Sequence, residues 1–138
     1  MSKPTPYYTG GCLCGALRYE ASAAPRYMGY CCCADCRKAS GSGFVPFMGF
    51  AGDTIRFSGE TRQHRMMALR SEAVRNFCPA CGGLVFGGDV GVDDLFNVYA
   101  GSLDDPSLFA PTIAIFVRDK PDWVMLPEGL RMYETMPE

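Results

Sequence analysis

Several kinds of feature are absent from this 138-residue sequence, and each absence narrows what the protein can be. Its apolar runs all fall well short of the roughly 20 residues that a membrane-spanning helix needs. Acidic and basic residues nearly balance, with 15 Asp and Glu against 13 Lys and Arg, so no face is built to neutralise a nucleic-acid backbone. Residues 1–8 hold two prolines and no apolar segment, which argues against a secretory signal. We therefore expect a cytoplasmic protein that binds neither nucleic acid nor membrane.

Histidine is nearly absent as well, whereas cysteine is abundant. His64 is the single histidine, and it is distant in sequence from every cluster among the eight cysteines. It lies between Gln63 and Arg65, so we expect a surface residue without a role. In a reducing compartment, clustered cysteines are more typical of metal ligation than of disulfides. A metal site in this chain must therefore consist almost wholly of sulfur, which favours zinc or an iron–sulfur cluster.

The 16 glycines and 10 prolines favour many short strands joined by tight turns over long helices. The segments that predict strands are 16–21, 26–31, 44–50, 54–58, 62–68, 73–77, 84–86, 95–100 and 112–117. Residues 34–39 predict a short helix, which the glycine-rich segment 40–43 ends. We therefore predict a mainly β fold of small coiled sheets, in a single domain over residues 1–138.

Three details of the strand pattern can be tested against the structure. Gly52 and Asp53 form a turn signal that predicts a hairpin between segments 44–50 and 54–58. Segment 112–117 is nearly all apolar, so we expect it near the centre of a sheet. The residues from Lys120 onward should form an ordered loop with one more short strand.

Two short turns carry the four outer cysteines, which are Cys12, Cys14, Cys78 and Cys81. In each turn a glycine follows the second cysteine, and it permits a tight bend whose amide N–H groups point back at the sulfurs. Two such turns brought together would hold zinc in the closed tetrahedron of a structural site. That metal would fasten the N-terminal strands to the middle of the chain and stand in for part of a modest core. The alternative is that these cysteines are reduced or disulfide-linked and hold no metal.

The inner cluster has four cysteines within six residues. In an extended segment Cys31 and Cys33 point to one face and Cys32 to the other. A helical turn then returns Cys36 to the side of the first two. Three converging thiolates would leave a zinc ion open to a substrate thiol, which binds as a thiolate. Two alternatives remain: Cys32 supplies a fourth ligand to a second structural site, or Cys33 and Cys36 act as a redox dithiol.

These motifs together resemble those of a known family. The segments that carry the resemblance read GGCLCGALRY at 10–19, CCCADCRKASGS at 31–42, FCPACG at 77–82 and IFVRDKPDW at 115–123. In this order and spacing the chain is similar to the glutathione-dependent formaldehyde-activating enzyme family, which includes centromere protein V. Two positions depart from the family pattern. Cys32 and Ala114 each stand where that family commonly has histidine.

The resemblance implies a fold, two metal sites and an activity. The implied fold is the β-tent, built of small coiled antiparallel sheets with zinc-binding knuckles. The implied structural zinc ligands are Cys12, Cys14, Cys78 and Cys81, and the implied catalytic zinc ligands are Cys31, Cys33 and Cys36. The family's founding activity joins glutathione and formaldehyde into S-hydroxymethylglutathione, which makes it a carbon–sulfur lyase in the reverse direction.

We therefore expect a zinc-dependent carbon–sulfur lyase-like enzyme that acts on a small thiol such as glutathione, with an aldehyde as candidate electrophile. Arg37 and Lys38 are candidates to hold substrate carboxylates, although a solvated helix face explains them equally well. Three large aromatic side chains are expected in the core rather than in a substrate site, namely Tyr99, Phe116 and Trp123. The alternative function is a zinc-stabilised binding module without catalytic activity.

Overall fold

The computed structural model describes residues 7–67 and 72–137, and within them the chain is mainly β, which confirms the predicted fold class. The strands are β1 (Tyr8–Gly11), β2 (Arg18–Ala21), β3 (Tyr27–Cys31), β4 (Val45–Ala51), β5 (Ile55–Ser58), β6 (Arg62–Met67), β7 (Glu72–Phe77), β8 (Leu84–Gly87), β9 (Leu95–Tyr99), β10 (Ile113–Ile115) and β11 (Arg131–Met132). The helical segments are α1 (Ala34–Ser40) and the 3₁₀ turns η1 (Gly52–Thr54), η2 (Ala100–Ser102), η3 (Pro106–Leu108) and η4 (Val117–Asp119). No helix in the described residues is long and apolar enough to cross a membrane.

Most predicted segments match an observed strand to within a few residues. The helix begins at Ala34 as predicted and ends at Ser40, where it is capped by Gly41, whose φ of 74° lies in the left-handed region that favours glycine. The short strand expected in the tail is β11. Strand β1 was not predicted, because its Thr-Gly-Gly sequence has little strand character of its own. The predicted segment 62–68 matches β6 as far as 67, and residue 68 lies outside the described residues.

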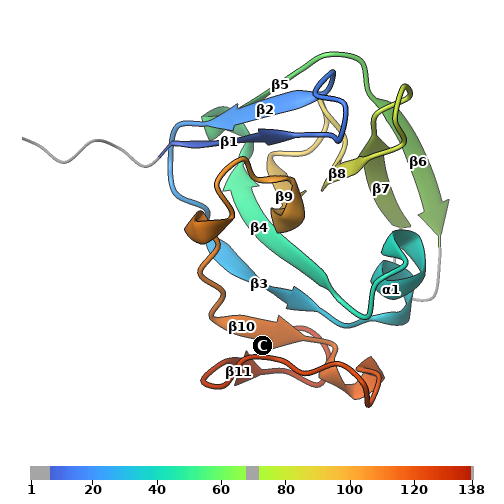
Figure 1. Cartoon of the computed structure of the whole chain (residues 1–138), viewed down its shortest axis with the longest axis vertical. Coiled ribbons are helices and arrows are strands. Elements are labelled where there is room, and N and C mark those ends of the chain that lie inside the picture. The colour runs from blue at the N-terminus through green and yellow to red at the C-terminus, as the bar shows by residue number, and fades with distance from the viewer. Residues whose placement is uncertain (1–6, 68–71, 138) are drawn as a thin grey trace, which may run out of the picture.

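The strands form two sheets that lie one above the other (Figure 1). The small sheet has the order β1-β2-β5, and the large one has the order β11-β10-β3-β4-β9-β8-β7-β6. All pairs are antiparallel except those of β10, which runs parallel to both β3 and β11. In Figure 1 the large sheet curves around the middle of the molecule, from β10 and β11 at the bottom to β6 and β7 at the right. This curvature places strands from distant parts of the chain around one cavity, which residues of β3, β4, β7 and β9 line.

The hairpin predicted around Gly52 does not form. Strand β5 pairs with β2 in the small sheet, whereas β4 pairs with β3 and β9 in the large one. The connecting residues adopt the 3₁₀ turn η1, in which the Thr54 hydroxyl donates to the Ala51 carbonyl at 2.7 Å. The Gly52 N–H donates to the Asp94 carbonyl, also at 2.7 Å. The turn therefore carries the chain from one sheet to the other instead of closing a hairpin.

The apolar segment 112–117 does not lie at the centre of its sheet. Only Ile113–Ile115 forms a strand, β10, and it lies second from the edge, between β11 and β3. The reason for its apolar side chains is the cluster that they pack into, rather than a central place in the sheet. Ile115 packs with Phe47 and Cys31 in a small buried cluster beside the inner cysteines.

The main core fills the space between the two sheets. Alternation along the strands of the large sheet sends one set of side chains to this core and the other set to the opposite face of that sheet. Phe57 of the small sheet stacks on Phe86 of the large one, with ring centroids 3.8 Å apart. Fully burying one such side chain contributes about 1.5–3 kcal/mol. The core members with less than 2% exposure include Leu17, Met48, Phe50, Val85, Phe86 and Val98.

Trp123, expected in the core, lies on the surface with 72% of its side chain exposed. Its neighbour Val124 takes the inward position and is 4% exposed. Both side chains lie against Gly43, where a Cβ atom would come within 2.3–2.8 Å of them. The aromatic ring therefore covers a loop rather than filling the interior.

Candidate metal centres

The four outer cysteines come together as the sequence predicts. The Sγ atoms of Cys12, Cys14, Cys78 and Cys81 all lie within 4.8 Å of one another. The Cys14 sulfur is 3.7 Å from the sulfurs of Cys12 and Cys78. Sulfurs placed tetrahedrally about 2.3 Å from a zinc ion lie ~3.8 Å apart. The donor set and its spacing therefore fit a closed zinc site.

Tight turns aim backbone amides at the outer sulfurs. Gly15 and Gly82 follow the two cysteine pairs with φ values of 83° and 75°, which side chains rarely allow. The Leu17 N–H donates to the Cys12 sulfur at 3.3 Å. On the other turn, hydrogen bonds from the backbone N–H groups of Cys14 and Gly83 lower the pKa of Cys81. These contacts stabilise the thiolate form that a metal ligand needs.

The three inner cysteines that were expected to converge also do so. The sulfurs of Cys31, Cys33 and Cys36 lie within 4.8 Å of one another. Cys31 ends β3, Cys33 is the N-cap of α1, and its sulfur accepts a hydrogen bond from the Cys36 N–H at 3.2 Å. Hydrogen bonds to the other two thiols, together with burial, raise the pKa of Cys31. Three thiolates are therefore disfavoured in so small a space unless a cation joins them, and zinc suits this donor set.

Cys32 points away from this group. Its side chain is fully buried and lies outside the set of converging sulfurs, while its backbone N–H donates to the Ile115 carbonyl at 3.0 Å. Burial raises the pKa of the Cys32 thiol. Among the described residues, no fourth cysteine, histidine or carboxylate joins the inner three. The geometry therefore fits an open site better than one closed by Cys32.

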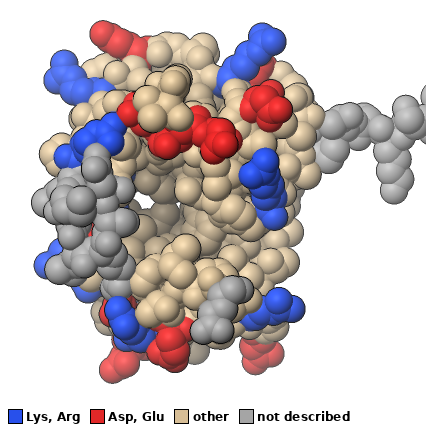
Figure 2. Space-filling view, turned by 180° about the vertical axis from the view of Figure 1, so that it is seen from behind, with Lys and Arg blue, Asp and Glu red and all other residues tan. Residues whose placement is uncertain are grey.

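A cavity of about 900 Å³ adjoins the inner cysteines. Figure 2 shows this face of the molecule hollowed, with acidic side chains along part of the rim. Cys31 and Cys36 lie in its wall, and most of the remaining lining is apolar, as in many small-molecule sites. Among the lining residues, Asp93 and Asp94 are exposed, which places them at the mouth. The converging sulfurs are thus reached from a cavity of substrate size.

Two polar residues in this cavity were missed by the sequence analysis. Arg75 of β7 and Tyr99 of β9 both line the cavity, and Gly87, which pairs with Arg75, leaves room beside it for the Tyr99 hydroxyl. Arg75 also interacts electrostatically with the thiol of Cys36. Burial raises the pKa of Tyr99 to about 12. Tyr99 was expected in the core, and the alternation of residues 95, 97 and 99 along its strand is the signal that could have placed it on a wall.

The cations proposed from the sequence lie elsewhere. Lys38 is exposed, and neither Lys38 nor Arg37 lines the cavity. Arg37 is half-buried, and its Nε has no hydrogen-bond partner among the described residues. Phe116, expected in the core, is half-buried against the small cluster that contains the inner cysteines. His64 is exposed, as expected.

Comparisons with known proteins agree with the cysteine motifs. The family profile described as "Glutathione-dependent formaldehyde-activating enzyme" matches residues 7–119, a range that includes both cysteine clusters. No curated protein matches the chain. A crystal structure of a Rhodobacter sphaeroides protein, a structural-genomics target, is similar with a TM-score of 0.53 and 17% sequence identity. The similarity covers 70% of this chain and 87% of that one, and it extends to the fold alone.

Proposed function

The chain belongs to the glutathione-dependent formaldehyde-activating enzyme family, and on this premise we propose that it is a zinc-dependent carbon–sulfur lyase-like enzyme. The reaction is the addition of a small thiol to an electrophilic carbon, and its reverse cleaves the same carbon–sulfur bond. The proposed catalytic residues are Cys31, Cys33 and Cys36, which would hold the reactive zinc. Bound there, zinc would supply a position that takes the thiol as its thiolate near neutral pH.

The observation that carries this proposal is the position of the inner cysteines beside a cavity. Three sulfurs within 4.8 Å of one another border a space of about 900 Å³. Three thiolates around one Zn²⁺ ion would give the site a net charge of −1. Such a donor set is poorly suited to activating water and well suited to accepting another soft ligand. This favours thiol chemistry over hydrolysis.

The chain's own residues have separate tasks in this proposal. The apolar walls, including Val45, Phe47 and Ile113, limit the water around the reacting sulfur. Arg75 offsets the negative charge that three cysteines and a bound thiolate bring together. At the mouth, Arg65 and the exposed Asp93 give charges of both signs, which suit a zwitterionic thiol such as glutathione.

The outer cysteines have a structural role in the same proposal. Cys12, Cys14, Cys78 and Cys81 would hold a second zinc ion that fastens the β1–β2 turn to the β7–β8 turn. The protein would then carry two zinc ions per chain and work in the cytoplasm, where thiols are abundant and stay reduced. An aldehyde is the proposed electrophile.

Metal analysis and thiol titration test the proposal. The protein loaded with two equivalents of zinc is titrated calorimetrically with glutathione and with ethanethiol under reducing conditions, and product formation with formaldehyde is followed by NMR. We expect thiol binding and addition in the wild type, and neither in Cys36→Ser with its fold intact. A loaded wild type that binds no thiol would contradict the enzyme proposal and favour the alternative, a zinc-stabilised binding module.

A further inference from the structure

One row of paired residues crosses the wall of the cavity. The register pairs Tyr27 with Gly49, Gly49 with Asn97, Asn97 with Gly87, and Gly87 with Arg75. Residues paired directly across antiparallel strands point to the same face of the sheet. Two glycines therefore alternate with three polar side chains along the row. Where the glycines stand, the wall has no side chain of its own.

Neighbouring tyrosines occupy the room that these glycines leave. A Cβ atom on Gly49 would lie 2.2 Å from the Tyr27 ring, whose hydroxyl donates to the Asn97 side-chain oxygen at 2.7 Å. In the same way, a Cβ atom on Gly87 would lie 3.2 Å from the Tyr99 hydroxyl oxygen. Tyr99 thus leans over Gly87 toward Arg75, one strand further along. The glycine brings the phenol and the guanidinium together.

The chemistry of this pair leaves a donor for a ligand. Arginine has only donors, so beside Arg75 the Tyr99 oxygen can only accept, which leaves its own O–H to be donated to another acceptor. Arg75 keeps further N–H groups, because a guanidinium carries five. Both side chains line the cavity with Cys31 and Cys36. The pair therefore presents converging donors in a largely apolar space close to the reacting sulfur, an arrangement that stabilises developing negative charge on oxygen.

We propose that Arg75 and Tyr99 bind the oxygen of the electrophile while a thiolate held at the inner cysteines attacks its carbon. This inference rests on the function proposed above and names the residues that would hold the oxygen of the aldehyde. The thiol releases its proton to solvent when it binds. Its sulfur then forms a bond to the carbonyl carbon, and the π-electron pair of the carbonyl moves to the oxygen. That oxygen takes a proton from solvent, so the product is a hemithioacetal and nothing is oxidised or reduced.

Thioacetate and ethanethiol are the probes that test this role. Both offer one sulfur, but only thioacetate carries an oxygen on the carbon bonded to that sulfur. The proposed adduct has its former carbonyl oxygen at the same place. Calorimetric titration of zinc-loaded protein gives the ratio of the two affinities. Comparing this ratio among variants removes the intrinsic difference between the two thiols, as a double-mutant cycle does. We expect Tyr99→Phe and Arg75→Met each to lower the preference for thioacetate about tenfold, the usual effect of losing one hydrogen bond to a charged group.

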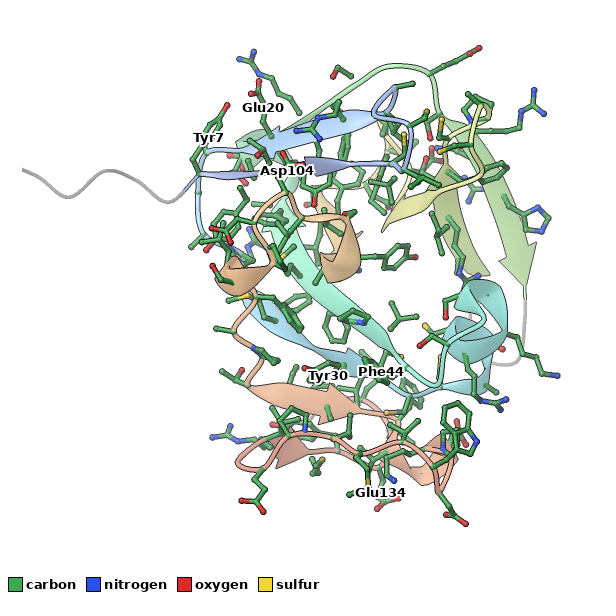
Figure 3. The ribbon with its side chains drawn as sticks, in the orientation of Figure 1. Tyr7, Glu20, Tyr30, Phe44, Asp104 and Glu134 are labelled. Atoms are coloured by element: carbon green, nitrogen blue, oxygen red, sulfur yellow. The ribbon has the colours of Figure 1, made fainter. Side chains whose placement is uncertain are left out.

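Tyr30→Phe is the matched control. Tyr30 lies on β3 beside Cys31 and packs edge-on against Phe44 and Phe109 instead of lining the cavity (Figure 3). This variant should keep the wild-type ratio. An unchanged ratio in both Tyr99→Phe and Arg75→Met would overturn the inference. This holds even if both affinities fall by the same factor, because Arg75 would then act only on the charge of the sulfur.

The probes also separate this inference from the proposed function. If the loaded wild type binds neither probe, the proposed thiol site is wrong, and the oxygen site is wrong with it. If it binds ethanethiol and the ratio is unchanged in both Tyr99→Phe and Arg75→Met, the thiol site stands and the oxygen site is wrong. Arg75→Met repeats the measurement from the other strand in case Tyr99→Phe folds poorly.

Discussion

The two cysteine clusters offer a metal the same kind of ligand in opposite settings. The outer cluster joins Cys14 to Cys78 across 64 positions of the chain and is partly exposed, whereas the inner one forms within six residues and borders a cavity. The first has four sulfurs at the spacing of a tetrahedron, and the second has three. The number of sulfurs and their surroundings, rather than the ligand type, separate a site suited to holding the fold together from one suited to chemistry.

The two clusters should also differ in how much a bound metal contributes to the stability of the folded chain. Closing a long loop with a metal stabilises a folded chain, because the unfolded chain loses the freedom that the cross-link removes. The inner cysteines are local, since β3 and the first turn of α1 already place them together. Removing a metal from the outer site should therefore affect stability, whereas removing one from the inner site should affect reactivity.

The largest effect is expected for Cys78→Ser. Cys78 is fully buried at the end of β7, and its loss would break the closed outer site. We expect a loss of several kcal/mol, comparable with the total stability of about 5–15 kcal/mol that such domains have, and therefore a largely unfolded protein. Circular dichroism with thermal unfolding measures it. Cys36→Ser is the matched control in the inner cluster, and equal destabilisation by the two changes would contradict the contrast.

Chelation should distinguish the two sites without any mutation. Three thiolates leave a zinc ion open to exchange, whereas four that join distant segments hold it through folding. A mild chelator should therefore remove about one equivalent of zinc while the circular dichroism spectrum stays unchanged. If both equivalents are released in a single step that coincides with unfolding, the two sites hold zinc equally firmly and the contrast is wrong.

Cys32→Ser tests whether the inner site is open. Because the Cys32 side chain points away from the other three sulfurs, the variant should keep both zinc ions, whereas Cys33→Ser should lose one. The expected destabilisation is about 1–3 kcal/mol, since a hydroxyl replaces a buried thiol. Zinc content of the two purified variants, measured side by side, decides the question. Equal losses of zinc would make Cys32 a ligand and the inner site closed.

The smallest effect concerns a polar link near the outer cluster. Asp104 accepts hydrogen bonds from Arg18 at 2.9 Å and from Thr9 at 2.8 Å, which ties the β1–β2 hairpin to the segment after η2 (Figure 3). The Arg18 guanidinium and the Thr9 hydroxyl lower the pKa of Asp104 from its ordinary 3.8 to about 2. Since the folded-state pKa is the lower one, the stabilisation is complete above pH 3.8 and is lost as the pH falls through 2.

We expect Asp104→Asn to cost no more than about 1 kcal/mol at neutral pH, because both side chains are more than a third exposed and solvent screens the pair. The difference from wild type should disappear as the pH falls below about 2. Denaturant unfolding at several pH values measures it, with Glu128→Gln on the exposed C-terminal loop as control. A loss as large as that of Cys78→Ser would mean that the ion pair, rather than a metal, holds the hairpin.

Local features of the chain were predictable from the sequence. Strand alternation and turn residues predicted most strands and the helix, because these depend on neighbours a few residues apart. The cysteine turns were predictable for the same reason, as the spacing from Cys12 to Cys14 and from Cys33 to Cys36 already sets the directions of the sulfurs. The failures are non-local. The pairing of β5 with β2, the position of β10 next to the edge strand β11 and the exposure of Trp123 each depend on which other segment lies alongside.

The mainly β character, the sulfur-only candidate ligands and the division into a four-cysteine and a three-cysteine set follow from the sequence alone. Which polar groups face the inner sulfurs depends on the tertiary structure. Arg37 is the nearest cation in sequence, yet Arg75 reaches the site, because the register of β7, β8 and β9 aligns it with Gly87 and lets Tyr99 lean toward it. Such an arrangement depends on the curvature of a sheet whose strands come from separate parts of the chain, and no local pattern encodes it.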